Sequence, residues 1–374
     1  MHVARLALID FRCYESADVT FEPGVTTFTG PNGAGKTNLI EAVYYVATFG
    51  SHRVATDTAM IRSGSERAIL RSSVRSAARD ALVEIELNAG RANRVRLNRA
   101  PLPRPREALG TLRCVLFAPE DLAIVKGDPA ERRHYLDDLL VASRPRFAGV
   151  RSDYERVVRQ RSALLKSARA SGRGVPAGLE VWDDQLVTHG AELTVARLRL
   201  TATLRPLIAE RYADVAGGGR DAAVRYRMGS ERSGGFDPEP DPGKIAQALR
   251  ESLDRLRRAE LERGVCLTGP HRDELELMIG DLPARGYASH GESWSLALAL
   301  RLAGFWLLRA DGEDPVLMLD DVFAELDAGR RDRLAELAAE AEQVLVTAAV
   351  AADVPSRLAG AAYSVASGVV SRGQ

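Results

Sequence analysis

Eight consecutive residues near the start of the chain have the types and spacing of a phosphate-binding loop. They follow an apolar run at residues 25–29 and match the pattern G-x-x-x-x-G-K-[ST] at every fixed position: Gly30, Pro31, Asn32, Gly33, Ala34, Gly35, Lys36 and Thr37. In such a loop, glycines let backbone N–H groups close around phosphate oxygens, and the following helix directs its positive end at the same anion. The lysine can reach the outer phosphates, and the threonine hydroxyl can coordinate Mg²⁺. The pattern therefore predicts a nucleoside triphosphate site, against the simpler alternative of a tight turn between a strand and a helix.

The lysine of this loop stands out against the composition of the chain. Only four lysines occur, Lys36, Lys126, Lys166 and Lys244, so arginine supplies nearly all the positive charge. A planar guanidinium cannot replace a compact ammonium inside a phosphate loop. The guanine-reading motif N-K-x-D is absent from the sequence, so ATP is the expected nucleotide.

A second segment supplies carboxylates for the same site. The apolar run at residues 316–319 ends in Asp320 and Asp321, as expected of a buried parallel strand whose first aspartate holds Mg²⁺ through water. Asp321 then stands where a carboxylate can orient and deprotonate the attacking water, so Lys36 and Asp321 are the candidate catalytic residues. Alone, a core strand capped by a helix-starting aspartate explains the segment equally well. Beside the phosphate loop, the catalytic interpretation is favoured.

Three more segments accompany these carboxylates. The residues Ser289, His290, Gly291 and Glu292 precede an apolar helix at residues 293–308 and can form a second anion-binding helix start, although a plain N-cap would look the same. Glu325, Leu326 and Asp327 come soon after the two aspartates, and Thr347 ends the next apolar strand. These are the positions of the signature, the D-loop and the switch residue in ABC-type ATPases.

Composition and charge exclude several classes of protein. The 374 residues are 45% hydrophobic and 27% charged, and 51 basic residues balance 51 acidic ones, so any nucleic-acid binding must use a local patch. Cys13, Cys114 and Cys266 are far apart and are expected to be reduced core thiols. No apolar run reaches membrane-spanning length and no signal peptide is recognisable, so we expect a cytoplasmic protein without a membrane partner.

Periodicity divides the chain into three parts. Strand-like alternation and the phosphate loop occupy residues 1–127, helical periodicity dominates residues 128–264, and the second set of nucleotide motifs lies in residues 265–374. Turn-rich segments at residues 217–219 and 229–243 interrupt the helical part, and the second is expected to be a mobile loop. We therefore expect an ATPase head that is interrupted by a helical insertion.

With these motifs in order, the chain resembles the RecF family, the SMC-like DNA-repair ATPases of bacteria, along nearly its whole length. The segments that carry the resemblance are residues 10–12, 30–37, 117–122, 126–129, 132–133, 136–137, 268–272, 289–292 and 320–327. The resemblance implies an α/β fold, an ABC-type (SMC-like) P-loop ATPase head with an inserted, mainly helical second lobe. It also implies an ATP-dependent homodimer in which the signature of one copy touches the γ-phosphate held by the other.

The resemblance carries further expectations about activity and partners. It implies ATP-dependent binding of single-stranded, gapped or junction DNA, and work with RecO and RecR in loading recombinase during repair and replication restart. Arg12 is a candidate for stacking on adenine. Hydrolysis is expected to be slow, because Asp321 is shorter than the glutamate common at this position. Glu292 replaces the usual glutamine and would weaken dimerisation if it faced the nucleotide, but it is expected to face away.

Two groups of arginines are candidates for DNA contact. One is Arg91, Arg94, Arg96 and Arg99, and the other is Arg151, Arg156, Arg159 and Arg161 on the helical insertion. Contacts of this kind predict salt-sensitive and sequence-tolerant binding. Two alternatives share the nucleotide motifs: the ATP-binding subunit of an ABC transporter, which normally lacks the long helical insertion, and a structural SMC-like DNA clamp, which the short arm disfavours.

Overall fold

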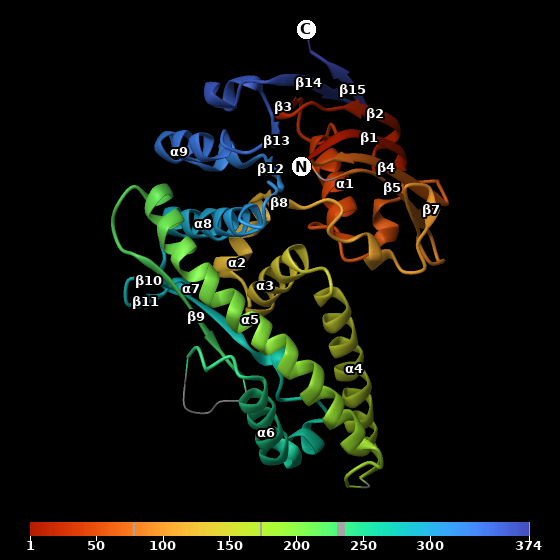
Figure 1. The fold of residues 1–374 in the computed structure, drawn as a ribbon, viewed down its shortest axis with the longest axis vertical. Helices are drawn as coiled ribbons and strands as arrows, with labels where there is room; N and C mark the ends of the chain where they lie inside the picture. Colours follow the sequence, from red (N-terminus) through yellow and green to blue (C-terminus); the bar gives the residue numbers. More distant parts are fainter. Residues whose placement is uncertain (78, 173, 230–235, 374) are drawn as a thin grey trace. The chain divides into compact units, whose positions relative to one another are not determined.

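The computed structural model describes residues 1–77, 79–172, 174–229 and 236–373 (Figure 1). The chain forms two compact units. The first contains Met1–Asp121, Arg211–Gly219 and Trp294–Gln374, and the second contains Leu122–Glu210 and Arg220–Ser293. Residues 230–235, which are part of the loop expected to be mobile at residues 229–243, lie outside the described residues.

A mainly parallel six-stranded sheet lies at the centre of the first unit. Its strands are β3 (Gly24–Thr29), β8 (Cys114–Phe117), β12 (Val316–Asp320), β13 (Gln343–Ala348), β14 (Ala361–Ala366) and β15 (Val369–Arg372), in the spatial order β15-β14-β3-β13-β12-β8. Every residue of β12 and β13 is buried, as expected of strands covered on both faces. Because β3, β13 and β12 are parallel neighbours, their carboxyl ends meet at one edge of the sheet.

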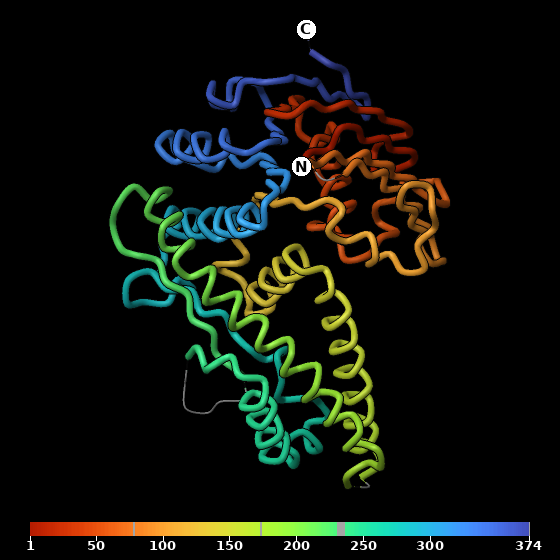
Figure 2. Tube along the Cα trace, viewed as in Figure 1, coloured from red at the N-terminus to blue at the C-terminus, as the bar shows by residue number. Residues whose placement is uncertain are grey.

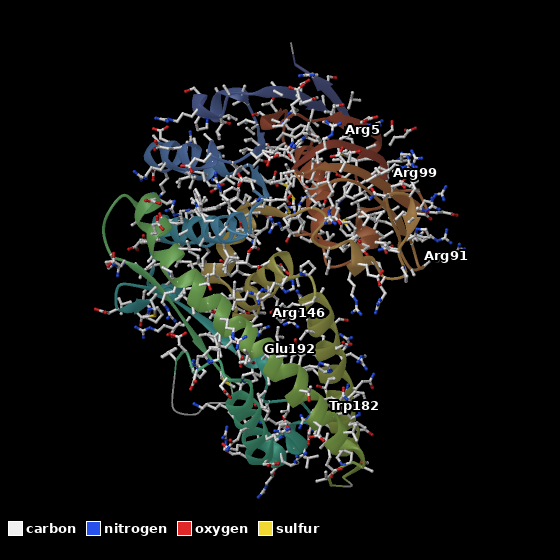
Figure 3. The ribbon with its side chains drawn as sticks, viewed as in Figure 1. Arg5, Arg91, Arg99, Arg146, Trp182 and Glu192 are labelled. Atoms are coloured by element: carbon white, nitrogen blue, oxygen red, sulfur yellow. The ribbon has the colours of Figure 1, made fainter. Side chains whose placement is uncertain are left out.

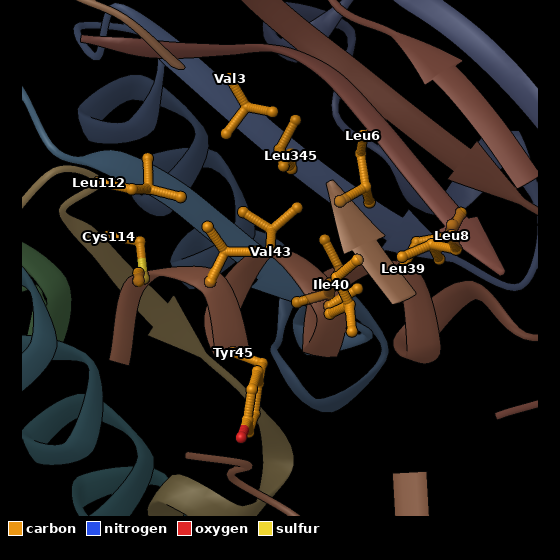
Figure 4. Close-up of a cluster of buried hydrophobic side chains, with 14 of the residues drawn as sticks. Val3, Leu6, Leu8, Leu39, Ile40, Val43, Tyr45, Leu112, Cys114 and Leu345 are labelled. Atoms are coloured by element: carbon orange, nitrogen blue, oxygen red, sulfur yellow. The ribbon is translucent and has the colours of Figure 1, made fainter. Parts of the chain in front are cut away.

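A second, antiparallel sheet packs against helix α1 (Lys36–Thr48). It runs in the order β2-β1-β4-β5-β6-β7, with β1 (His2–Phe11), β2 (Tyr14–Thr20), β4 (Arg67–Arg75), β5 (Asp80–Asn88), β6 (Arg94–Leu97) and β7 (Ala100–Pro101). Burial alternates along β4 and β5, so each strand turns one face to the core and the other to solvent. Figure 4 shows Leu6 and Leu8 of β1 together with Leu39, Ile40 and Val43 of α1 in this core.

The remaining elements of the first unit complete the head. They are α8 (His290–Arg309), which begins in the second unit, α9 (Ala328–Ala338), and the short helices η1 (Asp57–Met60), η2 (Pro105–Ala108), η3 (Pro119–Asp121), η5 (Val322–Glu325), η6 (Ala351–Asp353) and η7 (Ser356–Leu358). Cys13 is exposed, so the expectation that all three cysteines are core thiols was wrong for this one, whereas Cys114 and Cys266 are buried. Among the described helices, none combines the length and the apolar character needed to cross a membrane.

The second unit is mainly helical. Its helices are α2 (Leu122–Lys126), α3 (Pro129–Ser143), α4 (Phe147–Ser171), α5 (Leu179–Ala216, whose last residues belong to the first unit), α6 (Pro242–Arg263), η4 (Pro270–Arg272) and α7 (Ala284–Tyr287). A small antiparallel sheet, β11-β10-β9, accompanies them, with β9 (Ala222–Arg227), β10 (Glu274–Ile279) and β11 (Leu282–Pro283). The trace in Figure 2 shows the β9 and β10 segments side by side.

This small sheet explains why the second unit continues after α6. Residues 274–279 pair with residues 222–227 in an antiparallel ladder, which ties the segment after α6 to the helices that precede it. The second unit therefore extends past residue 264, where the sequence suggested a boundary. The units divide at residues 121/122, 210/211, 219/220 and 293/294. As a result, Ser289–Glu292 lie in the second unit and the phosphate loop lies in the first.

The arginines of α4 do not form the basic surface that was expected from the sequence. Arg161 is fully buried and pairs with Asp183 and Glu260, so its assignment to a DNA-binding surface was wrong. The other three candidate arginines of α4 all lie within 4.0 Å of carboxylates: Arg151 of Asp138 and Glu155, Arg156 of Asp153, and Arg159 of Glu155. This helix face is therefore close to electrically balanced.

Candidate nucleotide site

The phosphate loop, Gly30–Thr37, runs from the end of β3 into the first turn of α1. Its two outer glycines are required by close packing. A Cβ on Gly30 would lie 2.1 Å from the carbonyl oxygen of Val365 in β14. Gly35 has φ = 116°, and a Cβ there would lie 2.6 Å from Cys13 Sγ and 2.8 Å from the Tyr14 hydroxyl. The loop is thus held between β14 and the β1–β2 turn, and a side chain at either glycine would displace it.

Two side chains, one from the loop and one from β2, donate hydrogen bonds to backbone carbonyls of the loop. The Lys36 ammonium donates hydrogen bonds to the carbonyl oxygens of Gly30, at 2.8 Å, and Pro31, at 3.2 Å, and the residue is only 3% exposed. The buried Tyr14 hydroxyl donates to the carbonyl oxygen of Gly35 at 2.9 Å. The positive charge of Lys36 therefore lies across the loop, while Tyr14 supports the loop where α1 begins.

Three residues that are far apart in the sequence meet at the carboxyl ends of the parallel strands. The Thr37 hydroxyl donates to Asp320 Oδ1 at 3.0 Å, and the Thr347 hydroxyl donates to the same oxygen at 2.6 Å. The backbone N–H of Asp321 donates to Thr347 Oγ1 at 2.9 Å. This network joins the phosphate loop, the aspartate strand β12 and the predicted switch position on β13.

The oxygen atoms of this network suit one kind of cation. The described part of the chain contains no cluster of three or more His, Cys, Asp and Glu side chains that could enclose a metal. One carboxylate and one hydroxyl beside a phosphate loop match the preference of Mg²⁺, which binds through few protein oxygens and takes its other ligands from water and phosphate. The residues present fit Mg²⁺ brought by a nucleotide.

Burial raises the pKa of Asp320 to about 6. The hydrogen bonds from Thr347 and Thr37 oppose this shift, whereas the nearby charges of Asp321 and Glu120 add to it. A raised carboxyl pKa means that the folded protein binds the proton more tightly than the unfolded chain does. The resulting destabilisation is fully present above pH 6 and disappears as the pH falls towards 4.

We therefore expect Asp320→Asn to stabilise the nucleotide-free protein at pH 7.5, by about 1–3 kcal/mol, because asparagine removes the buried charge. The gain should shrink as the pH is lowered from 7.5 to 5, since the wild-type carboxylate is then largely protonated. Differential scanning calorimetry at both pH values measures the effect. Asp332→Asn, at an exposed position on α9, should change Tm little at either pH. A stabilisation by Asp320→Asn that is equally large at both pH values would refute the explanation.

The predicted catalytic aspartate occupies an unusual backbone conformation. Asp321 has φ = 50°, in the left-handed region, and directly precedes η5. This conformation costs a non-glycine residue on the order of 1 kcal/mol, although aspartate tolerates it better than most residues. The sharp turn ends β12 immediately after Asp320 and keeps Asp321 close enough to influence the pKa of its neighbour.

The predicted D-loop is anchored at its far end. Asp327 is the N-cap of α9, where its carboxylate accepts from the Arg330 N–H and pairs with the Arg330 guanidinium. Arg330 also donates to Ser295 Oγ at 2.9 Å. Leu326 is buried, whereas Glu325 is exposed. The segment is therefore tied both to α9 and to the first turns of α8.

The predicted signature forms a capping box at the start of α8. Ser289 Oγ accepts from the Glu292 N–H at 3.2 Å, and Glu292 Oε2 accepts from the Ser289 N–H at 2.9 Å. The Ser293 hydroxyl donates to the Ser289 carbonyl at 2.8 Å. His290 and Gly291 lie between these two capping residues, in the first turn of the helix. The Glu292 side chain thus folds back onto its own helix.

Some contacts of this region could not be read from the sequence. Arg12, the predicted adenine contact, makes a bidentate ion pair with the buried Glu41. Two guanidinium nitrogens donate to the two carboxylate oxygens, at 2.7 and 2.6 Å, and a third donates to the Ala59 carbonyl. Its role towards adenine stays a prediction. The only sequence signal for Glu41 was an acidic residue within the apolar part of α1. Asp121 pairs with Arg301 at 2.6 Å, which holds the end of β8 against α8.

Two residues of the predicted sequence motifs turn out to be structural. His271 lies 2.6 Å from the Tyr154 hydroxyl through its Nδ1 atom, and Arg272 donates to the Cys266 carbonyl from two nitrogens, at 3.1 and 2.7 Å. These contacts fold residues 266–272 into a tight loop within the second unit. His271 is half-buried in this loop, whereas Arg272 is exposed.

Comparison with known proteins agrees with this architecture. The chain matches the model of the RecF/RecN/SMC N-terminal domain over residues 2–355. It is 57% identical over 376 residues to the DNA replication and repair protein RecF of Frankia alni, with 100% of both chains covered. The structure of the recombination mediator protein RecF-ATPrS in the RecFOR pathway has a TM-score of 0.89 and 25% identity, covering 99% of this chain and 98% of that chain. An Smc head bound to the C-winged helix domain of ScpA shares the fold, with a TM-score of 0.56 at 16% identity over 100% of this chain and 97% of that chain.

The two sheets, the helical insertion and the phosphate loop beside β12 define an α/β, SMC-like P-loop ATPase head. This confirms the fold class predicted from the sequence. Within this class, the chain belongs to the RecF family of DNA replication and repair proteins. The full-length match favours neither of the two alternatives, a transporter subunit or a purely structural clamp.

Proposed function

We propose that this protein is an ATP-dependent DNA-binding protein of recombinational repair and replication restart. It dimerises on ATP, binds single-stranded or gapped DNA and helps to load recombinase. The observation that carries the proposal is the meeting of Thr37, Asp320 and Thr347 beside the phosphate loop, in a chain that matches RecF over its full length.

Each part of the site has a role in this proposal. The loop from Gly30 to Thr37 holds the triphosphate, and Lys36 neutralises its outer charges. Thr37 and Asp320 hold Mg²⁺, which neutralises charge on the transferred phosphoryl group. Asp321 orients the attacking water. Hydrolysis of this kind, slow and stimulated by DNA, would serve as a timing switch.

The second copy of the chain completes the site. The helix start at Ser289–Glu292 contacts the γ-phosphate held by the partner, because the N-terminus of a helix favours an anion. Residues 325–327 and Thr347 link this contact to the aspartate strand. RecO and RecR are the proposed protein partners, since the similar RecF structure is one of the RecFOR pathway. The proposed location is the cytoplasm.

Size-exclusion chromatography with light scattering tests the proposal. The protein is run with Mg²⁺ and ATP, with ADP, and without nucleotide, and each sample is then titrated with gapped duplex DNA. We expect a dimer with ATP only, and tighter capture of gapped DNA by that dimer. A mass and a DNA affinity that are the same in all three conditions would contradict the proposal.

The outward face of the antiparallel sheet is the best candidate for the DNA contact. Arg91, Arg94, Arg96 and Arg99 are exposed around β6, and Figure 3 shows Arg91 and Arg99 at the end of the sheet that carries β6 and β7. Arg94 lies 3.9 Å from Glu86. Within the described part of the chain, Arg91, Arg96 and Arg99 form no ion pair. Their positive charge is therefore available to phosphates.

Arg99 offers a sharp test because it occupies a strained position. It follows Asn98 in the two-residue turn between β6 and β7, with φ = 71° after φ = 51°, a conformation that favours Asn-Gly. We expect Arg99→Gly to stabilise the protein by about 0.5–1 kcal/mol. The same change should lower DNA affinity and reduce the slope of log affinity against log salt by about 0.9, the loss of one phosphate contact.

Urea unfolding and fluorescence anisotropy with gapped DNA at several salt concentrations measure the two effects. Arg99→Lys is the matched control, since it keeps both the charge and the left-handed backbone. Its stability and salt slope should stay near those of the wild type. If Arg99→Gly is more stable but binds DNA with an unchanged salt slope, Arg99 does not contact phosphate.

A further inference from the structure

Glu292 places a negative charge at the helix start that is proposed to receive phosphate. Its carboxylate lies at the N-terminus of the 20-residue helix α8 and accepts from the Ser289 N–H at 2.9 Å. That hydrogen bond, followed by those from Arg220 and Ser289 Oγ, lowers the pKa of Glu292 to about 2. The side chain is therefore ionised at neutral pH. An ionised carboxylate beside an incoming phosphate is repulsive unless another charge cancels it.

Arg220 supplies the cancelling charge. One of its terminal nitrogens donates to Glu292 Oε1 at 2.6 Å, so the two carboxylate oxygens are shared between Arg220 and the Ser289 backbone. A charge-assisted hydrogen bond of this length is among the stronger kinds. The glutamate is consequently held along its helix by two partners on opposite oxygens.

The position of Arg220 is itself determined by the small sheet. Arg220 stands two residues before β9, and its side-chain stem runs past Gly280 at the end of β10. A Cβ on Gly280, which has φ = 59°, would lie 3.2 Å from Arg220 Cδ. The Gly280 N–H donates to the carbonyl oxygen of Asp221 at 2.7 Å. Arg220, Gly280, Ser289 and Glu292 all belong to the second unit, so this arrangement is built within one compact body.

The capping box leaves Ser289 able to act as a donor. Its oxygen accepts from the Glu292 N–H, and its hydroxyl hydrogen, which points to the Glu292 carboxylate, can rotate towards another acceptor. Ser289 is exposed. A phosphate that approaches this helix start would meet the hydroxyl and the helix dipole, together with a carboxylate whose charge is already paired.

We propose that Arg220 is a positioning residue for the phosphate contact between two copies of this chain: it holds Glu292 in the capping position and cancels its charge, so that Ser289 can receive the γ-phosphate bound by the partner. This inference rests on the proposed ATP-dependent dimer. It assigns a role to a residue outside the nucleotide motifs, and it explains how a signature that ends in glutamate can still take an anion.

A double-mutant cycle tests the inference. Arg220→Ala, Glu292→Gln and the double variant are compared with the wild type by sedimentation at saturating Mg²⁺ and ATP. We expect Arg220→Ala to weaken dimerisation about tenfold, equivalent to about 1.4 kcal/mol. Glu292→Gln should dimerise at least as tightly as the wild type, and Arg220→Ala should have little further effect in that background, because no carboxylate charge remains to be cancelled.

Two controls separate this role from a structural one. Arg285→Ala removes another exposed ion pair of the same unit, with Asp128 at 2.8 Å, and should leave dimerisation unchanged. The affinity of the monomer for a fluorescent ATP analogue should be the same in all variants, since the phosphate loop is untouched. Equal losses from Arg220→Ala with glutamate or glutamine at position 292 would overturn the inference while leaving the proposed function intact. A wild-type protein that stays monomeric with ATP would overturn both.

Discussion

Lys36→Met is expected to abolish ATP binding while leaving the fold intact. The Lys36 ammonium spans the phosphate loop, with hydrogen bonds to the Gly30 and Pro31 carbonyls at 2.8 and 3.2 Å. Methionine fills a similar volume but brings no charge to the phosphates. Loss of charge-assisted contacts in a nearly buried site should weaken ATP binding by about 100-fold or more, roughly 3 kcal/mol. Isothermal titration calorimetry with Mg²⁺ and ATP measures the loss.

The consequences of Lys36→Met should extend to every ATP-dependent step. The variant should remain a monomer with ATP and should capture gapped DNA no better than the nucleotide-free wild type. Lys166→Met, at an exposed position on α4, removes one of the other three lysines and should bind ATP normally. An affinity of Lys36→Met within threefold of the wild type would show that the triphosphate does not lie in this loop.

The local parts of this site could be predicted because their residue types define their geometry. Glycine, lysine and threonine within eight residues dictate a strand, a loop and a helix start, whatever the rest of the chain does. The apolar run before Asp320 likewise indicates a strand that is covered on both faces. The structure places β3 and β12 at these positions, with α1 beginning at Lys36.

How the local parts meet could not be derived from spacing. Thr37 and Asp320 are 283 positions apart, and their contact depends on β13 lying between β3 and β12 in the sheet. No periodicity encodes strand order. Glu41 was missed for a related reason: a buried carboxylate is stable only with a partner such as Arg12, and that partner comes from the turn between β1 and β2.

Contacts between distant segments are even harder to predict from the sequence in the helical insertion. The ladder between β9 and β10 joins segments about fifty residues apart, so nothing local revealed that residues 274–279 pack with the helices. Arg161 looked like one arginine of a solvated helix face. Its burial depends on Asp183 and Glu260, which lie 22 and 99 positions away. Charged residues on a helix indicate a solvent-exposed face only when no buried residue of opposite charge lies next to them in the fold.

Arg161→Met is therefore expected to be among the most destabilising single changes in the second unit. The fully buried guanidinium donates to Asp183 at 2.7 Å and to Glu260 at 2.6 Å, and it lies 3.3 Å from Cys266 Sγ. Glu260 is itself completely buried. Removing the arginine leaves that carboxylate without its cation, which costs about 3–5 kcal/mol. Urea unfolding followed by circular dichroism measures the loss, and Arg159→Met, two positions away on an exposed face, should change stability by less than about 0.5 kcal/mol.

A second substitution distinguishes an uncompensated charge from lost packing. Glu260 also accepts from the Leu267 N–H at 2.7 Å, and glutamine can keep that hydrogen bond without the charge. Asp183 retains its ion pair with Arg257 at 2.7 Å. Arg161→Met combined with Glu260→Gln should therefore be more stable than Arg161→Met alone, since no buried carboxylate is then left without a cation. If the double variant is less stable than the single one, the loss comes from the packing of the arginine side chain and not from the charge that it leaves behind.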